Sequence, residues 1–479
     1  MKPSSPSFLW HDYETFGADP RRDRPAQFAA IRTDDKLAPI GDAVVIYCQP
    51  SQDMLPQPDA CLITGITPQL ARERGLPEPA FATQIHQLMS EPDTCSVGYN
   101  NFRFDDEVSR FLFWRNFLDP YAREYSNGNS RFDLIDLMRM CCALRPQGLN
   151  WPLRDDGKPS FRLEDLAAAN GLDVSRAHDA LADVEATIGL ARLLLKHQPR
   201  LWQWALSLRQ KHVVSALLGK GEILLHSSAR LGASHCATAP ILPLAPHPQF
   251  NGQWLAWNLN IDPAQFAGLD QEQLGDRLWT PSADLPEGTE RLPVKLIRAN
   301  RCPMISPFNV LDAEARQRLA IDPGLVADRA ARLRGDSALI SRLTGLFAAS
   351  GGQSPDPELA LYDGFIPRSD QPTMARVRLL DEEALIRLGE PFADRRLNEL
   401  LFRYRARHFP NSLDADDQAR WQSLRRRRLL EDPELASIRW PEYQARLTEL
   451  RHSHPEHGEL WHALDEWAIE LGLTGANTG

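Results

Sequence analysis

Acidic side chains follow apolar segments at three places in the N-terminal part of the chain. The motif D-Y-E-T at 12–15 follows the apolar residues 8–10, the motif N-F-R-F-D ends at Asp105, and H-D-A-L-A-D occupies 178–183. Side chains two apart on a strand point to the same face, so we expect Asp12 and Glu14 to share one face of a strand.

Asp105 and Asp183 are both predicted to lie on helices. Asp105 follows a strand-like stretch at 94–100 and opens a periodic helical pattern. Asp183 lies in a helix with an apolar stripe, and Asp179 is its predicted N-cap. His178 would therefore lie just before this helix. On a continuous helix it would be turned about 140° away from Asp183, whereas a loop position lets it turn toward the same site.

These five side chains together predict a two-metal site that hydrolyses phosphodiesters. Such hydrolysis uses two divalent cations roughly 3.5–4 Å apart, and Mg²⁺ prefers carboxylate oxygens. A nearby histidine can accept the proton of the attacking water. Each motif alone has another explanation: an exposed acid pair, a helix cap at Asp105 or an ordinary loop histidine at His178. Their order along the chain favours the metal site.

Composition indicates a conventional globular protein. With 479 residues, 54.0 kDa and 43% hydrophobic residues, we expect two to four domains. The seven cysteines form no C-x-x-C pair, and only Cys141 and Cys142 are adjacent, on a predicted core helix. This pattern suits a reducing compartment and argues against a zinc ribbon.

Residues 1–6 lead into the first strand and no apolar stretch is long enough to cross a bilayer, so we expect a cytoplasmic protein without signal peptide or membrane span.

A basic stretch offsets the net charge of −10. Residues 395–428 contain ten arginines and only four acidic residues, and aromatic side chains stand among them at 402, 404, 409 and 421. Stacking on aromatics within a basic groove is how proteins bind single strands without sequence preference. The alternative is an arginine-rich helix face exposed to solvent.

Sequence texture predicts three domains. Residues 1–200 alternate strand-like runs with periodic helices, as in an α/β nuclease domain. Residues 201–349 open with a helix at 202–218 and continue with proline-rich strands at 241–244 and 254–257, which predicts a small β-rich domain. A linker-like stretch follows at 350–357. Residues 357–479 have a helical pattern.

The motifs resemble the DEDDh branch of the DnaQ-like exonucleases, and longer segments resemble bacterial exodeoxyribonuclease I. These segments are 11–17, 23–32, 62–67, 98–101, 159–164, 293–296 and 400–407. The resemblance implies a ribonuclease H-like α/β domain, an SH3-like middle domain and an α-helical C-terminal domain. It also implies a 3′–5′ exonuclease that acts on single-stranded DNA, releases 5′-mononucleotides and serves DNA repair and recombination.

The same resemblance implies roles for individual residues. Asp12 would contact two Mg²⁺ ions, for which Mn²⁺ can substitute. Glu14 and Asp183 would complete the first metal site, Asp105 would hold the second ion, and His178 would be the general base. Glu14 and Arg162 would also contact the terminal nucleotide. Further DNA contacts would be Arg110, Tyr121, Tyr125, Arg139, Lys211, Lys295 and Tyr362.

The resemblance also implies a protein partner, the acidic C-terminal tail of the single-strand DNA-binding protein. Its basic pocket would be formed by Arg145, Trp204 and Arg334, although tyrosine is expected where Trp204 stands. The three domains would enclose the DNA within a monomer. Two other functions remain open, because the acidic residues do not distinguish DNA from RNA: an exoribonuclease of the same fold, or a non-catalytic DNA-binding scaffold.

Overall fold

The computed structural model describes residues 6–175, 178–232, 235–281, 283–348, 352 and 354–473. The chain divides into two compact units. The first contains residues 1–130, 175–185 and 352–479, and the second contains 131–174 and 186–351. Ser350, Gly351 and Gln353 of the predicted linker lie outside the described residues.

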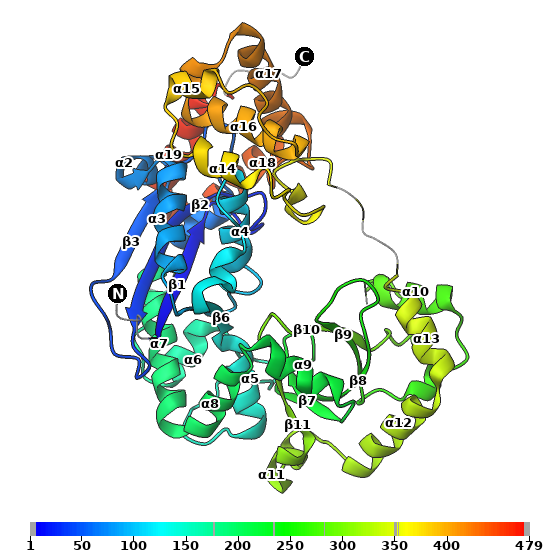
Figure 1. Cartoon of the computed structure of the whole chain (residues 1–479). Helices are drawn as coiled ribbons and strands as arrows, with labels where there is room; N and C mark the ends of the chain where they lie inside the picture. Colours follow the sequence, from blue (N-terminus) through cyan, green and yellow to red (C-terminus); the bar gives the residue numbers. More distant parts are fainter. Residues whose placement is uncertain are drawn as a thin grey trace. The chain divides into compact units, whose positions relative to one another are not determined.

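The first unit is built on a mixed sheet. Five of its strands lie in the order β4-β3-β2-β1-β5, and Figure 1 shows β3, β2 and β1 side by side. β1 is antiparallel to β2 and parallel to β5, so β1 lies inside the sheet with neighbours on both sides. The bounds are β1 Ser7–Thr15, β2 Pro25–Thr33, β3 Val44–Cys48, β4 Gly75–Leu76 and β5 Thr94–Gly98.

Helices α3 and α4 cover one face of this sheet. Their buried apolar side chains, including Phe81 and Leu112, pack against Leu9 and Phe28 of the central strands. The four helices of this part are α1 Pro58–Thr64, α2 Pro68–Arg74, α3 Glu78–Ser90 and α4 Asp105–Arg115. The predicted strand and helix around Asp12 and Asp105 are thus confirmed.

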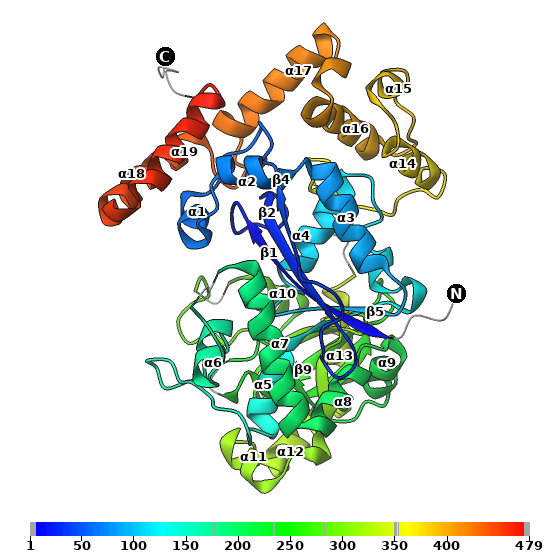
Figure 2. The same cartoon turned by 90° about the vertical axis from the view of Figure 1, so that its left-hand side faces the viewer.

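The C-terminal helices belong to the same unit and pack on it at two places. α18 and α19 lie beside α1 and α2 (Figure 2), with Trp461 and Trp467 buried in the shared core. Phe117, just after α4, stacks on Phe392 with ring centroids 5.6 Å apart. The bounds are η6 Ala360–Tyr362, α14 Gln371–Val377, α15 Glu382–Ile386, α16 Arg395–His408, α17 Ala415–Arg426, the π-helical turn η8 Arg427–Glu431, α18 Trp440–Ser453 and α19 Gly458–Glu470.

The second unit contains the predicted β-rich domain, an antiparallel sheet of order β10-β9-β8-β7-β11. The predicted strands at 241–244 and 254–257 lie in β8 and β9. The predicted helix at 202–218 is two helices, α8 and α9, because the chain turns at 208–210. The bounds are β6 Ser130–Asp133, α5 Leu134–Leu144, α6 Leu163–Ala169, α7 Ala180–His197, which begins in the first unit, α8 Pro199–Ser207, α9 Lys211–Gly219, β7 Leu224–Ser227, β8 Thr238–Pro246, β9 Gln253–Asn258, α10 Gln271–Trp279, β10 Val294–Arg298, β11 Met304–Pro307, α11 Ala313–Arg318, α12 Pro323–Gly335 and α13 Ser337–Gly345.

A buried network of ion pairs joins the C-terminal helices of the first unit to its sheet. Arg407 on α16 pairs with Asp53 at 2.7 Å and with Glu358 at 2.5 Å. Arg24 also reaches Glu358, at 2.7 Å. All four side chains are at least 95% buried. Although burial alone would raise the carboxyl pKa, the arginines hold the pKa values of Asp53 and Glu358 well below their usual range.

The prediction that residues 395–428 form a base-stacking groove is wrong for helices α16 and α17. Phe402, Tyr404 and Trp421 are buried, and Arg403 is buried in an ion pair with Asp356 at 2.9 Å. The aromatic residues form the apolar side of α16 and α17. Arg405 and Arg428 are largely buried against carboxylates, whereas Arg426 and Arg427 pair with Glu431 and Asp432 and remain exposed.

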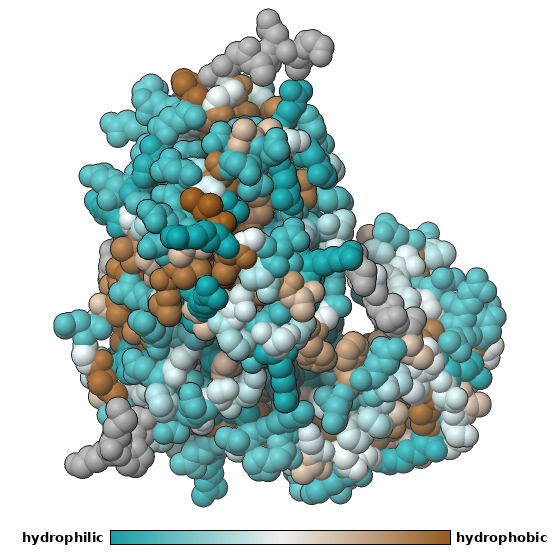
Figure 3. Space-filling view, turned by 45° about the horizontal axis from the view of Figure 1, so that its top comes forward, coloured by the Kyte–Doolittle hydropathy of each residue, from teal (hydrophilic) through white to brown (hydrophobic). Residues whose placement is uncertain are grey.

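The surface is mostly hydrophilic on the face that Figure 3 presents, with apolar residues in separate patches. Such a surface is expected for a chain in which 25% of the residues are charged. Among the described residues, we find no helix whose length and hydropathy would let it span a lipid bilayer.

The buried network predicts a strong effect on stability. Asp53→Ala should lower the free energy of unfolding by about 3–5 kcal/mol, because it leaves the buried Arg407 charge without its main partner. Glu383→Ala is the matched control, because the Glu383–Arg387 pair is exposed, and it should change stability by less than about 1 kcal/mol. Urea unfolding of both variants measures the difference, and equal effects would contradict the structural role of the network.

Candidate metal centre and neighbouring residues

Strand β1 places Asp12 and Glu14 on one face and the alternate residues on the other. His11 stacks on Phe28 with centroids 6.0 Å apart, and Tyr13 packs on the same ring at 4.8 Å. Both lie on the side of the apolar core. Burial lowers the pKa of His11 to about 3, so His11 is neutral near pH 7. The predicted alternation is confirmed, and the two carboxylates point away from the core.

Asp105 stands at the first position of α4 and is fixed from β1. Its Oδ1 accepts a hydrogen bond from the backbone N–H of Tyr13 at 3.0 Å, and the side chain is 3% exposed. The neighbouring Asp106 pairs with the fully buried Arg123 at 2.7 Å. Asp106 therefore has a structural partner, while Asp105 is held beside Asp12 and Glu14.

Helix α7 brings the third motif to the site. Asp179 caps the helix, since its Oδ1 accepts from the backbone N–H of Ala182 at 3.1 Å. Asp183 lies in the first turn, and ligand oxygens of Asp12, Glu14 and Asp183 lie within 4.8 Å of one another. His178 precedes the cap with a φ of 67°, so the chain turns there as predicted, and its side chain is exposed.

The electrostatics of this group are those of crowded carboxylates. Burial is the largest cause that raises the pKa of Asp12, followed by the charges of Asp105, Glu14 and Asp183. The pKa of Glu14 rises to about 8, through burial and then through Asp183 and Asp105. Like charges held this close favour protonation in the absence of a cation. This direction contrasts with the lowered pKa of the arginine-paired Asp53.

The donor set fits a hard divalent cation. Three carboxylates converge, and a fourth, Asp105, is close enough to act on two of them electrostatically. Carboxylate oxygens are the ligands that Mg²⁺ and Mn²⁺ prefer, and a cation would relieve the repulsion that raises the pKa values.

Several predicted DNA contacts of the first unit form one group. Arg110 pairs with Glu124 at 2.8 Å and with Glu107 at 2.8 Å. It also donates to the hydroxyl of Tyr362 at 3.1 Å and lies over the ring of Tyr121, with its Cζ 5.5 Å from the centroid. Arg110 is 4% exposed, so it orients the tyrosines rather than presenting a free charge.

Two tyrosines present open surface for a ligand. Tyr362 is 46% exposed and Tyr125 is 69% exposed. Sequence reasoning missed Glu107 and Glu124, the carboxylates that hold Arg110. Glu107 could have been found from the sequence, because it lies three residues before Arg110 on a predicted helix. No local sequence signal indicates Glu124.

The second unit holds the other predicted contacts, Arg139, Arg162, Lys211 and Lys295. Arg139 pairs with Asp136 and lies over the ring of Phe161, while the exposed Arg162 pairs with Glu164 at 2.5 Å. Two lysines complete the set: Lys211 begins α9 and lies against Gly252, and Lys295 is partly buried on β10.

The residues of the predicted partner pocket have protein partners of their own. Arg145 pairs with Asp312 at 3.1 Å and donates to the carbonyl of Val310. Trp204 donates to the carbonyl of Ile305 at 2.9 Å, so Arg145 and Trp204 both contact the region of β11 and the segment after it. Arg334 donates instead to the carbonyl of Gly221, at 2.9 Å.

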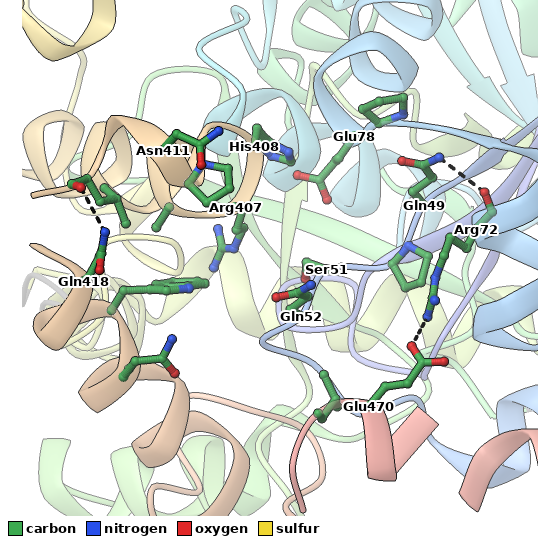
Figure 4. A pocket seen from close by; sticks show the side chains of 18 of the residues that line it. Gln49, Ser51, Gln52, Arg72, Glu78, Arg407, His408, Asn411, Gln418 and Glu470 are labelled. Atoms are coloured by element: carbon green, nitrogen blue, oxygen red, sulfur yellow. Dashed lines mark hydrogen bonds and ion pairs between the residues drawn. The ribbon is translucent and has the colours of Figure 1, made fainter. Parts of the chain in front are cut away.

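A cavity of about 920 Å³ lies elsewhere in the first unit and is not the acidic site (Figure 4). Its charged side chains are paired: Arg72 with Glu470 at 2.5 Å, and Glu78 with Arg115 at 2.8 Å. His408 and Asn411 stand on another wall. None of the four predicted metal ligands lines it, so this cavity does not mark the predicted site of hydrolysis.

Family models cover nearly the whole chain. Residues 9–191 match the model described as Exonuclease, 209–349 match the Exonuclease I SH3-like domain, and 355–471 match the Exonuclease I C-terminal domain. The predicted fold class, an α/β nuclease domain followed by an SH3-like and a helical domain, is confirmed.

Two proteins with similar sequences have the same name, exodeoxyribonuclease I. Exodeoxyribonuclease I of Escherichia coli K12 is 46% identical over 424 residues, covering 88% of this chain and 89% of that protein. The Haemophilus influenzae protein of that name is 40% identical and covers 97% and 98%.

Solved structures agree with this result. Exonuclease I of Methylocaldum szegediense is 45% identical with a TM-score of 0.92, covering 97% of this chain and 99% of that one. E. coli exonuclease I with a dA16 oligonucleotide is 43% identical with a TM-score of 0.92, covering 98% and 100%. A zinc-bound form of the E. coli enzyme with single-stranded DNA is 42% identical, with a TM-score of 0.92 and the same coverage. The predicted family and enzyme class are confirmed: this chain belongs to the exodeoxyribonuclease I family of hydrolytic exonucleases.

Proposed function

We propose that this protein hydrolyses single-stranded DNA stepwise from the 3′ end, releases 5′-mononucleotides and acts in DNA repair and recombination. The observation that carries the proposal is the group of Asp12, Glu14 and Asp183 oxygens within 4.8 Å of one another, beside Asp105. The family supports DNA as substrate, since similar structures contain DNA oligonucleotides.

The four carboxylates would hold two Mg²⁺ ions, with Mn²⁺ as a substitute. Asp12 would contact both ions, Glu14 and Asp183 would complete one site, and Asp105 would hold the other. Bound cations would activate water at neutral pH and offset charge on the leaving oxygen. The hydrogen bond from the Tyr13 amide to Asp105 and the Asp179 cap of α7 would hold these ligands in place before a metal binds.

His178 would act as the general base. Its position before the cap of α7 leaves its side chain exposed, and from there it would turn toward the attacking water. A histidine can change protonation near neutral pH, which suits it to accept the proton of the attacking water. Arg162 and Glu14 would hold the terminal nucleotide.

The strand itself would be bound by aromatic and basic side chains. Tyr125 and Tyr362 would stack on bases, with Arg110, which lies over the ring of Tyr121, positioning Tyr362. Arg139, Lys211 and Lys295 would contact phosphates.

The remaining proposals concern organisation and partners. Division into domains at 1–200, 201–349 and 357–479 would let a monomer enclose the strand. Arg145, Trp204 and Arg334 would receive the C-terminal carboxylate of the single-strand DNA-binding protein, since arginine pairs bidentately with carboxylates. The buried free cysteines support a cytoplasmic location.

Cleavage of labelled substrates tests the proposal directly. With 5′-labelled single-stranded DNA and Mg²⁺, products should shorten from the 3′ end, while matched RNA and duplex DNA persist. Asp183→Ala should slow cleavage at least about 100-fold because it removes a metal ligand. Glu185→Ala, an exposed carboxylate slightly further along α7, should cleave normally. Faster loss of RNA would instead establish an exoribonuclease, and binding without cleavage would establish a scaffold.

The raised pKa of Glu14 predicts a pH-dependent response to metal. Without metal, Glu14 binds a proton more tightly in the folded protein than in the unfolded chain. The stabilisation that this proton gives the folded state is therefore lost as pH rises from about 4.5 to about 8. Mg²⁺ competes with that proton and should raise the Tm more at pH 8.5 than at pH 6. Asp183→Asn should raise the metal-free Tm at pH 8.5 by about 2 °C and reduce the Mg²⁺ effect. Calorimetry that shows the same Mg²⁺ effect at both pH values would contradict this assignment.

Lys211 and Lys295 predict a salt effect on DNA binding. Each phosphate contact contributes about 0.7 to the slope of log K against log salt for single strands. Substituting both with alanine should lower that slope by about 1.4, measured by fluorescence anisotropy of a labelled oligonucleotide without Mg²⁺. The exposed Lys196 and Lys220, also in the second unit, provide the control double variant. Equal slopes in the two double variants would contradict the proposed phosphate contacts of Lys211 and Lys295.

A further inference from the structure

Two buried cysteines of the second unit meet although they are far apart in the sequence. Cys142 lies in the last turn of α5, and Cys236 lies just before β8. Their sulfur atoms are 3.2 Å apart, with the Cys142 thiol donating to Cys236. Each residue is 4% exposed.

The surrounding backbone holds both residues in position. Helix α5 packs on β7 and β8. The β7–β8 hairpin continues as far as Ala237, the residue after Cys236, because the Ser228 N–H donates to the Ala237 carbonyl at 2.8 Å. Cys236 and Ala237 have φ values of 48° and 51°, in the left-handed region that residues with a Cβ rarely adopt. The hairpin thus holds a strained turn that brings Cys236 to α5.

This geometry is close to that of a disulfide. Bonded sulfur atoms lie closer together than these two, so bond formation requires the sulfur atoms to approach by about 1 Å. The adjacent Cys141 differs, because its thiol donates to the carbonyl of Arg145 at 3.0 Å.

The local charge favours a reactive thiol at Cys236. The hydrogen bond from Cys142 lowers the pKa of Cys236, and the guanidinium of Arg318 lowers it further. Arg318 is fixed near the pair by its bond to the carbonyl of Ala143 at 3.1 Å. A positive charge beside a thiol increases the fraction of nucleophilic thiolate.

We propose that Cys142 and Cys236 are an oxidation site that hydrogen peroxide closes to a disulfide. The Cys236 thiolate attacks peroxide, an S–O bond forms, the O–O bond breaks, and after proton transfer one water leaves. The Cys142 thiol then attacks that sulfur, the S–S bond forms, the S–O bond breaks, and a second water leaves. The thiols lose two electrons and two protons, and peroxide is reduced to two waters.

Burial determines which oxidant can act. With each residue 4% exposed, a small neutral peroxide reaches the sulfur more readily than a bulky disulfide such as oxidised glutathione. The bond would link α5 to the β7–β8 hairpin across a separation of 94 residues. A link of this length restricts the unfolded chain, so the oxidised second unit should unfold at a higher temperature.

Thiol counting and peptide mapping of the full-length protein test the proposal. Peroxide treatment, alkylation in denaturant and non-reducing tryptic digestion should join peptide 140–154 to peptide 231–277 and lower the free thiols from seven to five. Dithiothreitol should restore seven. Oxidised glutathione should produce the same link more slowly.

Single variants assign the bond within these peptides. Cys141→Ser is the matched control, since it removes the neighbouring thiol from the same peptide and should still form the link. Cys142→Ser and Cys236→Ser should each abolish it. Seven thiols remaining in the treated wild-type protein, or a link that disappears in Cys141→Ser and persists in Cys142→Ser, would overturn the proposal.

Discussion

The pairing of buried arginines with buried carboxylates determines how the first unit is assembled. A charge that is removed from water without a partner costs several kcal/mol, so Arg407 can lie inside only where Asp53 and Glu358 meet it. Asp53 lies between β3 and α1, whereas Arg407 lies on α16, close to the other end of the chain. The network therefore requires the C-terminal helices to return to the sheet, and their apolar faces supply the remaining contact with α1 to α4.

The candidate metal centre shows the opposite electrostatic pattern within the same unit. Asp53 and Glu358 have arginine partners and lowered pKa values, while Asp12 and Glu14 lie beside other carboxylates and have raised ones. A fold tolerates such repulsion where a ligand relieves it, which is why perturbed carboxylates mark functional sites. The direction of the pKa shift thus separates the carboxylates that hold the fold together from those that would bind a cation.

Sequence reasoning succeeded where the relevant geometry is local. The period of a strand placed Asp12 and Glu14 on one face, and the cap at Asp179 placed His178 outside α7. It failed for the arginines of 395–428, because the carboxylates that bind Arg403 and Arg407 lie far away in the sequence and no local pattern shows them. The prediction of one helix at 202–218 failed for a smaller reason: no glycine or proline marks the turn of the backbone at 208–210.

The segment 356–362 shows how the ion network extends to the exposed Tyr362. Arg403 binds Asp356, Trp114 donates to the carbonyl of Pro357 at 2.9 Å, and Arg24 and Arg407 bind Glu358. Slightly further along, Arg396 donates to the carbonyl of Ala360, and Arg110 then meets the hydroxyl of Tyr362. Nearly every residue of this segment is thus fixed by a side chain from α4, α16 or the sheet. Buried charges hold the start of this segment at Asp356 and Glu358, and Arg110 and Glu107 of α4 hold the hydroxyl of the exposed Tyr362 at its end.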